Sequence, residues 1–112
     1  MPVTLYHNPR CSKSRQTLAL LEENGVTPQV IEYLKTPPDA KTLRDLLQKL
    51  GLGPRDILRS KEAAEAGIGP DLEGEALIDA MVANPVVIER PIVVSGGKAR
   101  LGRPPEQVLE IL

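Results

Sequence analysis

The sequence of 112 residues predicts a single α/β domain with a mixed sheet of four or five strands and flanking helices. A strand, a helix and a second strand follow one another over residues 3–34, and two short apolar runs joined by Gly96-Gly97 come near the end. Strands joined through a helix run parallel, whereas strands joined by a tight turn run antiparallel. Both kinds of pairing should therefore occur in one sheet.

The first strand is the apolar run at residues 3–6, and the first helix follows Cys11 and ends before Gly25, which suits a helix C-cap. Residues 29–34 have the composition of a second strand, which a right-handed crossover places parallel to the first. Cys11 then lies at the carboxyl end of a strand, where open α/β sheets bind their ligands.

A helical insertion is expected over about residues 38–83. Leucines at positions 43, 46, 47 and 50 recur at helical spacing, and apolar residues at 77, 78, 81 and 82 mark a second amphipathic helix. Between them, residues 54–71 read as short helical pieces broken by glycine and proline.

Three strand candidates follow the insertion, at residues 85–88, 91–95 and 98–101, and apolar residues at 108, 109 and 112 predict a terminal helix after Pro104-Pro105. A parallel strand-helix-strand unit, then an antiparallel hairpin and a helix, with a thiol at the first strand-to-helix turn, is the layout of the thioredoxin-like fold. A fold by itself assigns no activity.

Composition narrows the function classes. A net charge of −1 and only two aromatic residues argue against nucleic-acid binding. No apolar stretch is long enough to span a membrane and no secretion signal opens the chain, so we expect a cytoplasmic protein without a membrane partner. A single cysteine excludes an internal disulfide, and one histidine with one cysteine does not make a zinc site, so no metal is expected.

Cys11 is the best nucleophile candidate, because a helix start and nearby basic side chains favour a thiolate. The alternative is a buried, inert cysteine. A protonated His7 would help the thiolate electrostatically, although a lone histidine is as often structural. The Ser14 hydroxyl could hydrogen-bond the thiolate, and Asn8 could do the same or form the turn. We assign Arg10 and Arg15 to the local field and the helix surface.

Five segments in order resemble the signatures of the glutaredoxin-coupled arsenate reductases, which belong to the thioredoxin-like superfamily. They are HNPRCSKSR at 7–15, YLKTPP at 33–38, LRSKE at 58–62, NPVVIERPIVV at 84–94 and GRPPE at 102–106. The resemblance runs from residue 4 to the C-terminus, and five ordered segments are far more specific than one cysteine.

The resemblance implies that Cys11 attacks arsenate while Arg59, Arg90 and Arg103 surround the oxyanion. Guanidinium groups suit this role, because each is permanently charged and presents a planar fork of donors to a tetrahedral anion. Pro91 holds a position similar to the cis-proline that faces the active thiol in this fold.

The resemblance also implies glutathione as co-substrate and glutaredoxin as partner. We expect a monomer without a bound cofactor. Glutathione and glutaredoxin fit a chain that lacks a second thiol to resolve the adduct on Cys11. The phosphatase-like arsenate reductases, with Cys-x5-Arg, do not fit, because Thr17 takes the place of that arginine. Two alternatives stay open: a thiol-switch regulator similar to the Spx proteins, which bind RNA polymerase, and an oxidoreductase of the same family with another substrate.

Overall fold

The computed structural model describes residues 2–112, which form two compact units. The first unit combines the chain up to Thr36 with Arg90–Leu112, and the second comprises Pro37–Glu89. The second unit holds the predicted helical insertion but extends to residue 89, where we expected the insertion to end at about residue 83.

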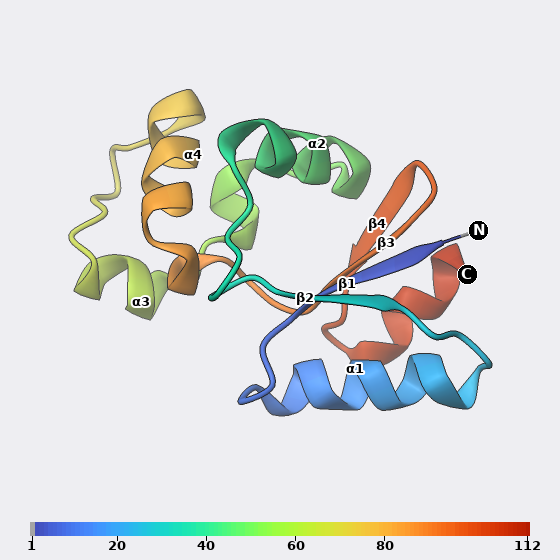
Figure 1. Ribbon diagram of the computed structural model, residues 1–112. Helices are drawn as coiled ribbons and strands as arrows, with labels where there is room; N and C mark the ends of the chain where they lie inside the picture. Colours follow the sequence, from blue (N-terminus) through green and yellow to red (C-terminus); the bar gives the residue numbers. More distant parts are fainter. Residues whose placement is uncertain (1) are drawn as a thin grey trace. The chain divides into compact units, whose positions relative to one another are not determined.

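The first unit is built on a four-stranded sheet in the order β2-β1-β3-β4, shown in Figure 1. β1 and β2 pair in parallel, with His7 opposite Glu32, while β3 pairs antiparallel with both β1 and β4. This mixed sheet confirms the predicted α/β class. The strands are β1 (Val3–His7), β2 (Gln29–Glu32), β3 (Ile92–Ser95) and β4 (Lys98–Leu101).

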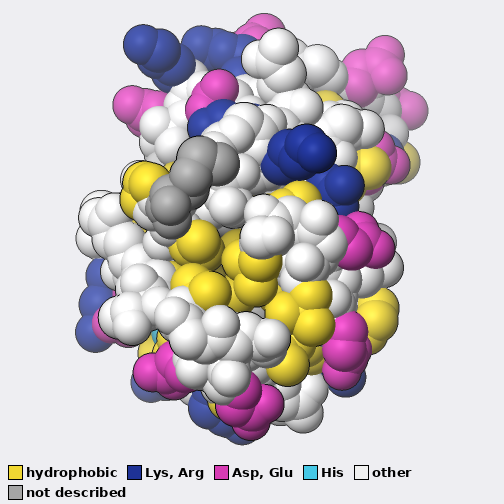
Figure 2. Space-filling model, turned by 90° about the vertical axis from the view of Figure 1, so that its right-hand side faces the viewer, with side chains coloured by type: hydrophobic (Ala, Val, Ile, Leu, Met, Phe, Trp, Pro, Cys, Tyr) yellow, Lys and Arg dark blue, Asp and Glu magenta, His cyan; other side chains and the backbone are white. Residues whose placement is uncertain are grey.

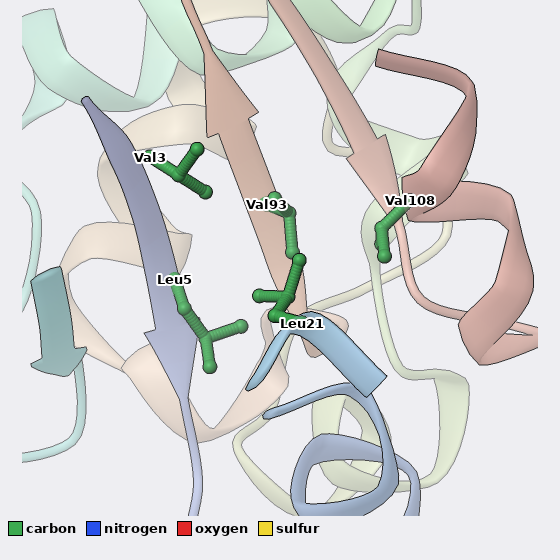
Figure 3. Packing of buried hydrophobic residues seen from close by; sticks show 5 residues of the cluster. All are labelled: Val3, Leu5, Leu21, Val93 and Val108. Atoms are coloured by element: carbon green, nitrogen blue, oxygen red, sulfur yellow. The ribbon is translucent and has the colours of Figure 1, made fainter. Parts of the chain in front are cut away.

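Helix α1 (Ser12–Glu23) and the C-terminal 3-10 helix η3 (Pro105–Ile111) lie on the same side of this sheet (Figure 1). The core between them consists of aliphatic side chains, drawn in Figure 3, of which all but Val3 are completely buried: Val3, Leu5, Leu21, Val93 and Val108. Because side chains alternate along a strand, the face of β1 that carries Val3 and Leu5 also carries His7. The core packing therefore directs His7 to the side of the sheet where α1 lies.

The second unit is helical, as its leucine spacing predicts. Helix α2 begins at the N-cap Asp39, whose side chain accepts a hydrogen bond from the Thr42 N–H, and ends at Gly51 with a φ of 71°. The elements are α2 (Ala40–Leu50), η1 (Pro54–Ile57), α3 (Ser60–Glu65), α4 (Gly74–Ala83) and η2 (Pro85–Val87).

The strand predicted at residues 85–88 is wrong. These residues form the 3-10 turn η2, and Ile88 makes only an isolated antiparallel bridge to Leu58. Pro85 starts a helical turn easily because the first N–H of a helix needs no partner, and proline cannot donate to a strand ladder. The terminal helix η3 was predicted correctly in place, but it is a 3-10 helix throughout.

Figure 2 shows one face of the molecule, on which basic and acidic side chains are interspersed and hydrophobic side chains are exposed between them. This mixed surface fits the net charge of −1. Within residues 2–112 there is no helix long and apolar enough to cross a bilayer.

Candidate active site

The turn between β1 and α1 is held by hydrogen bonds of its own. The Cys11 N–H donates to the Asn8 carbonyl at 2.9 Å, and the Arg10 N–H donates to the Asn8 side-chain oxygen at 3.0 Å. The Arg15 guanidinium donates to the Pro9 carbonyl at 2.9 Å. Of the two roles considered for Asn8, the structure shows the one in the turn, and Arg15 helps to hold that turn in place.

Cys11 is the N-cap residue of α1, with an extended backbone at φ −90° and ψ 124°, and its side chain is half-buried. Its Sγ makes no regular cap hydrogen bond, yet the amides of Ser14 and Lys13 are near enough to stabilise a thiolate. Burial raises the pKa of Cys11, but these amides, a hydrogen bond from Arg90 and the charge of Arg103 together lower it below that of a free thiol. The geometry therefore favours the reactive cysteine over the inert one.

Arg90 precedes β3 and Arg103 follows β4, so both lie at the same end of this pair of antiparallel strands. Ile92 of β3 pairs with Leu101 of β4, so the residues just beyond this pair are neighbours. The Arg103 Nη2 lies 3.7 Å from the Cys11 Sγ, and its Nε donates to the Arg90 carbonyl at 2.8 Å. Two of the three predicted oxyanion-binding arginines thus meet at the thiol, where they form a cluster of positive charge.

Pro91 and Gly102 bring α1 and the two strands close together. The Arg90–Pro91 peptide bond is cis, and the Gly102 N–H donates to the Pro91 carbonyl at 2.9 Å. A Cβ on Gly102 would lie 2.7 Å from the Pro91 Cγ and would collide with the Thr17 Oγ1. Sequence reasoning missed Gly102 as a site residue, although its position directly before Arg103 was a signal.

The Ser14 hydroxyl serves a different purpose from the one predicted. Its Oγ lies 2.7 Å from the His7 Nδ1 and accepts a hydrogen bond from the Asn8 N–H at 3.0 Å, in a completely buried position. The predicted bond from this hydroxyl to the thiolate is replaced by the backbone amide of Ser14. The hydroxyl instead ties the first turn of α1 to the end of β1.

His7 is 6% exposed, and burial lowers its pKa below the ordinary 6.5, an effect that the charge of Arg15 reinforces and that of Glu32 opposes. A ring with such a pKa is mainly neutral at pH 7. The expectation that a protonated His7 supports the thiolate through its charge is therefore not upheld. His7 acts through its hydrogen bond with Ser14.

Arg59, the third predicted arginine, belongs to the second unit. Its Nε donates to the Glu62 carboxylate and its Nη1 to the Glu89 carboxylate at 2.7 Å. Burial lowers the pKa of Arg59, but the two carboxylates outweigh it and the pKa is raised. The oxyanion role of Arg59 stays a prediction, because its charge is shared between two glutamates that the sequence did not single out.

Comparisons with known proteins identify the family of this chain. The ArsC family matches residues 6–111. The uncharacterized protein YfgD of Escherichia coli K12 is 60% identical over 114 residues, covering 98% of this chain and 96% of that protein. An arsenate reductase of Neisseria meningitidis is 45% identical over 114 residues, with coverage of 98% and 97%.

Among solved structures, the arsenate reductase from Vibrio cholerae superposes with a TM-score of 0.93 at 54% identity, covering 100% of this chain and 98% of that one. The chain belongs to the ArsC family. This confirms the family that the five sequence segments indicate, together with the predicted thioredoxin-like fold.

Proposed function

We propose that this protein is an arsenate reductase in which Cys11 is the nucleophile. The observation that supports the proposal best is a thiol with a lowered pKa that lies 3.7 Å from the Arg103 guanidinium and accepts a hydrogen bond from Arg90. Such a site combines a nucleophile with fixed donors for an oxyanion. The named relatives point to the same substrate, because two of the proteins described above are arsenate reductases.

In the first step the Cys11 thiolate attacks arsenic, an S–As bond forms, and one arsenate oxygen leaves as water after protonation. Arg90 and Arg103 donate to the remaining oxygens, on which negative charge increases during the attack. Their planar guanidinium groups suit this task better than ammonium groups, since each can bind two oxygens at once.

In the second step we infer that glutathione attacks the Cys11 sulfur. A disulfide forms between the two sulfurs, and the electron pair of the S–As bond stays on arsenic, which is thereby reduced from arsenate to arsenite. The glutathione proton passes to an arsenite oxygen. Cys11 is the only cysteine of the chain, so the mixed disulfide requires an external thiol, which we assign to glutaredoxin.

A coupled assay tests this function. The purified protein is given arsenate, glutathione, glutaredoxin, glutathione reductase and NADPH, and the oxidation of NADPH is followed. We expect turnover that requires both glutathione and glutaredoxin, that is absent in Cys11→Ser, and that thioredoxin alone does not support. If no arsenate is turned over while Cys11 still forms a glutathione mixed disulfide, the protein is an oxidoreductase of this family with another substrate.

A further inference from the structure

A small hollow lies beside the Cys11 turn, at the carboxyl ends of β1 and β2. Its volume is about 230 Å3, and its walls are residues 7–10 of the turn together with Glu32, Leu34 and Lys35. It is formed entirely within the first unit. The carboxyl ends of parallel strands are where ligands of open α/β sheets bind.

The walls of the hollow carry both signs of charge and an apolar surface. Arg10 and Lys35 supply cations, Glu32 supplies a carboxylate, and Leu34 is 42% exposed. Lys35 and Glu32 form an ion pair at 3.5 Å with side chains that are 78% and 41% exposed. Exposed pairs of this length are weak, so both groups are available to a ligand that offers opposite charges of its own.

We propose that this hollow binds the γ-glutamyl end of glutathione, an inference that rests on the function proposed above. That end is a zwitterion with an ammonium group for Glu32, a carboxylate for Lys35 or Arg10, and methylene groups that can pack on Leu34. The volume suits an amino-acid-sized group, because sites for whole drug-sized ligands measure roughly 300–1,000 Å3.

The position of the hollow lets the rest of glutathione reach the thiol. Arg10 lines the hollow and is covalently joined to Cys11. The sulfur of glutathione belongs to its central residue, so the extended segment from the γ-glutamyl end to the cysteine spans about 7 Å, whereas neighbouring Cα atoms are about 3.8 Å apart. A glutathione held by its γ-glutamyl end can therefore place its sulfur against Cys11.

The test uses glutathione disulfide without arsenate, so that its outcome does not depend on the substrate of the enzyme. The Cys11 thiolate attacks one sulfur of this disulfide, a Cys11–glutathione disulfide forms, and one glutathione thiolate leaves. We compare the rate with that of the N-acetylated disulfide, in which a neutral acetamide replaces each ammonium group, in the parent and in Glu32→Gln. Any effect of the added acetyl group is common to both proteins.

We expect the rate with glutathione disulfide, divided by the rate with the acetylated disulfide, to be about threefold to fivefold higher in the parent than in Glu32→Gln. This factor corresponds to the free energy of a partly exposed ion pair. Dividing the ratio in the parent by the ratio in Glu32→Gln cancels the intrinsic reactivities of both disulfides and of Cys11. The loss of the Glu32 charge also favours the acetylated disulfide through the general field, since this disulfide is the more negative one. The ratios are therefore compared at high salt, which screens the general field more than a direct contact. Equal ratios in the parent and in Glu32→Gln would overturn the proposal.

Two controls complete the experiment. Lys98→Gln removes an exposed lysine whose strand partner Ser95 pairs with Val3, at the opposite end of the sheet from the Cys11 turn, and it should leave both rates unchanged. Lys35→Gln should slow glutathione disulfide by about threefold, while the uncharged 2,2′-dithiodipyridine should react with all variants at the parent rate. If the protein turns over arsenate but the rate ratio is the same in the parent and in Glu32→Gln, the subsite is rejected and the proposed function is kept. If the rate ratio falls in Glu32→Gln but no arsenate is turned over, the subsite is kept and the proposed function is rejected.

Discussion

Arg103 and Arg59 were predicted to do the same work, but the two units of the molecule give them different surroundings. Arg103 places its Nη2 beside a thiol and is oriented by the Arg90 carbonyl. Arg59 is surrounded by carboxylates from Glu62 and Glu89. Arg103 therefore adds positive charge to its site, whereas the two carboxylates more than balance the charge of Arg59.

The difference shows that residue type alone does not assign a role to an arginine. A guanidinium beside a neutral or anionic sulfur attracts further anions, but one already bound by two carboxylates has fewer donors left to offer. Glu89 precedes Arg90 directly in the chain, so the partner of one arginine and the second site arginine are consecutive residues.

Lysine substitutions should separate the two arginines most strongly. Arg103→Lys keeps the charge but loses the planar fork, and we expect kcat/KM for arsenate to fall by about 10- to 100-fold, the value of one or two hydrogen bonds to a charged group. Arg59→Lys should cost clearly less. Steady-state kinetics in the coupled assay measure both, and equal losses would show that Arg59 binds the oxyanion as strongly as Arg103.

Gly102→Ala tests the close approach of strand and helix behind Arg103. The added Cβ would collide with Pro91 and Thr17, so we expect the free energy of unfolding to fall by about 1–3 kcal/mol. Gly97→Ala is the matched control, because a Cβ there meets nothing within 4 Å. Urea denaturation measures the free energy of unfolding of both variants. Equal values would mean that the structure accommodates a Cβ at Gly102 with no loss of stability.

The ion pairs that Arg59 forms with Glu62 and Glu89 can be weakened by neutralising a glutamate. Glu89→Gln removes one partner from an ion pair whose side chains are 24% and 23% exposed, and we expect a loss of stability of about 1 kcal/mol. Glu110→Gln, in the more exposed pair with Arg100, should have a smaller effect. Thermal or urea unfolding measures the stability of both variants. An increase in the stability of Glu89→Gln would show that the ion pair between Arg59 and Glu89 does not stabilise the fold.

The order of elements was predictable because the sheet and the helices follow simple periodic patterns. The strand expected at 85–88 is wrong because a short apolar run fits a 3-10 turn as well as a strand, and Pro85 favours the turn. Cys11 could be singled out from the sequence because it lies between a predicted strand and a predicted helix. Arg90 and Arg103 were named through the resemblance to the arsenate reductases, and the structure places both near the Cys11 sulfur.

Other parts of the site depend on three-dimensional contacts. The Ser14 hydroxyl was assigned to the nearest chemical group in the sequence, whereas the fold offers it His7 from the facing strand and the Asn8 amide. The carboxylates around Arg59 come from residues 62 and 89, which no local pattern connects. Gly102 has no room for a side chain, because Pro91 and Thr17 occupy the space where a Cβ would lie. No sequence pattern brings these three residues together.

The smallest effect is expected for His7. Its pKa in the folded protein lies below the ordinary 6.5, so at acidic pH the unfolded chain binds more protons than the folded one. The free energy of unfolding should therefore rise with pH up to about 6.5 and then level off for this group. Urea denaturation at several pH values should show this slope in the parent and a weaker slope in His7→Gln, and equal slopes would contradict the assignment.

We infer that the amides of α1, together with Arg90 and Arg103, hold Cys11 as a thiolate. The rate of alkylation by iodoacetamide as a function of pH measures this directly, with glutathione as the reference thiol and Arg103→Gln as the variant. We predict that the midpoint for Cys11 lies clearly below that of glutathione and shifts upward in Arg103→Gln, because the stabilising charge is lost. A midpoint at or above about pH 8.5, the pKa of an ordinary thiol, would show that these groups do not stabilise the Cys11 thiolate.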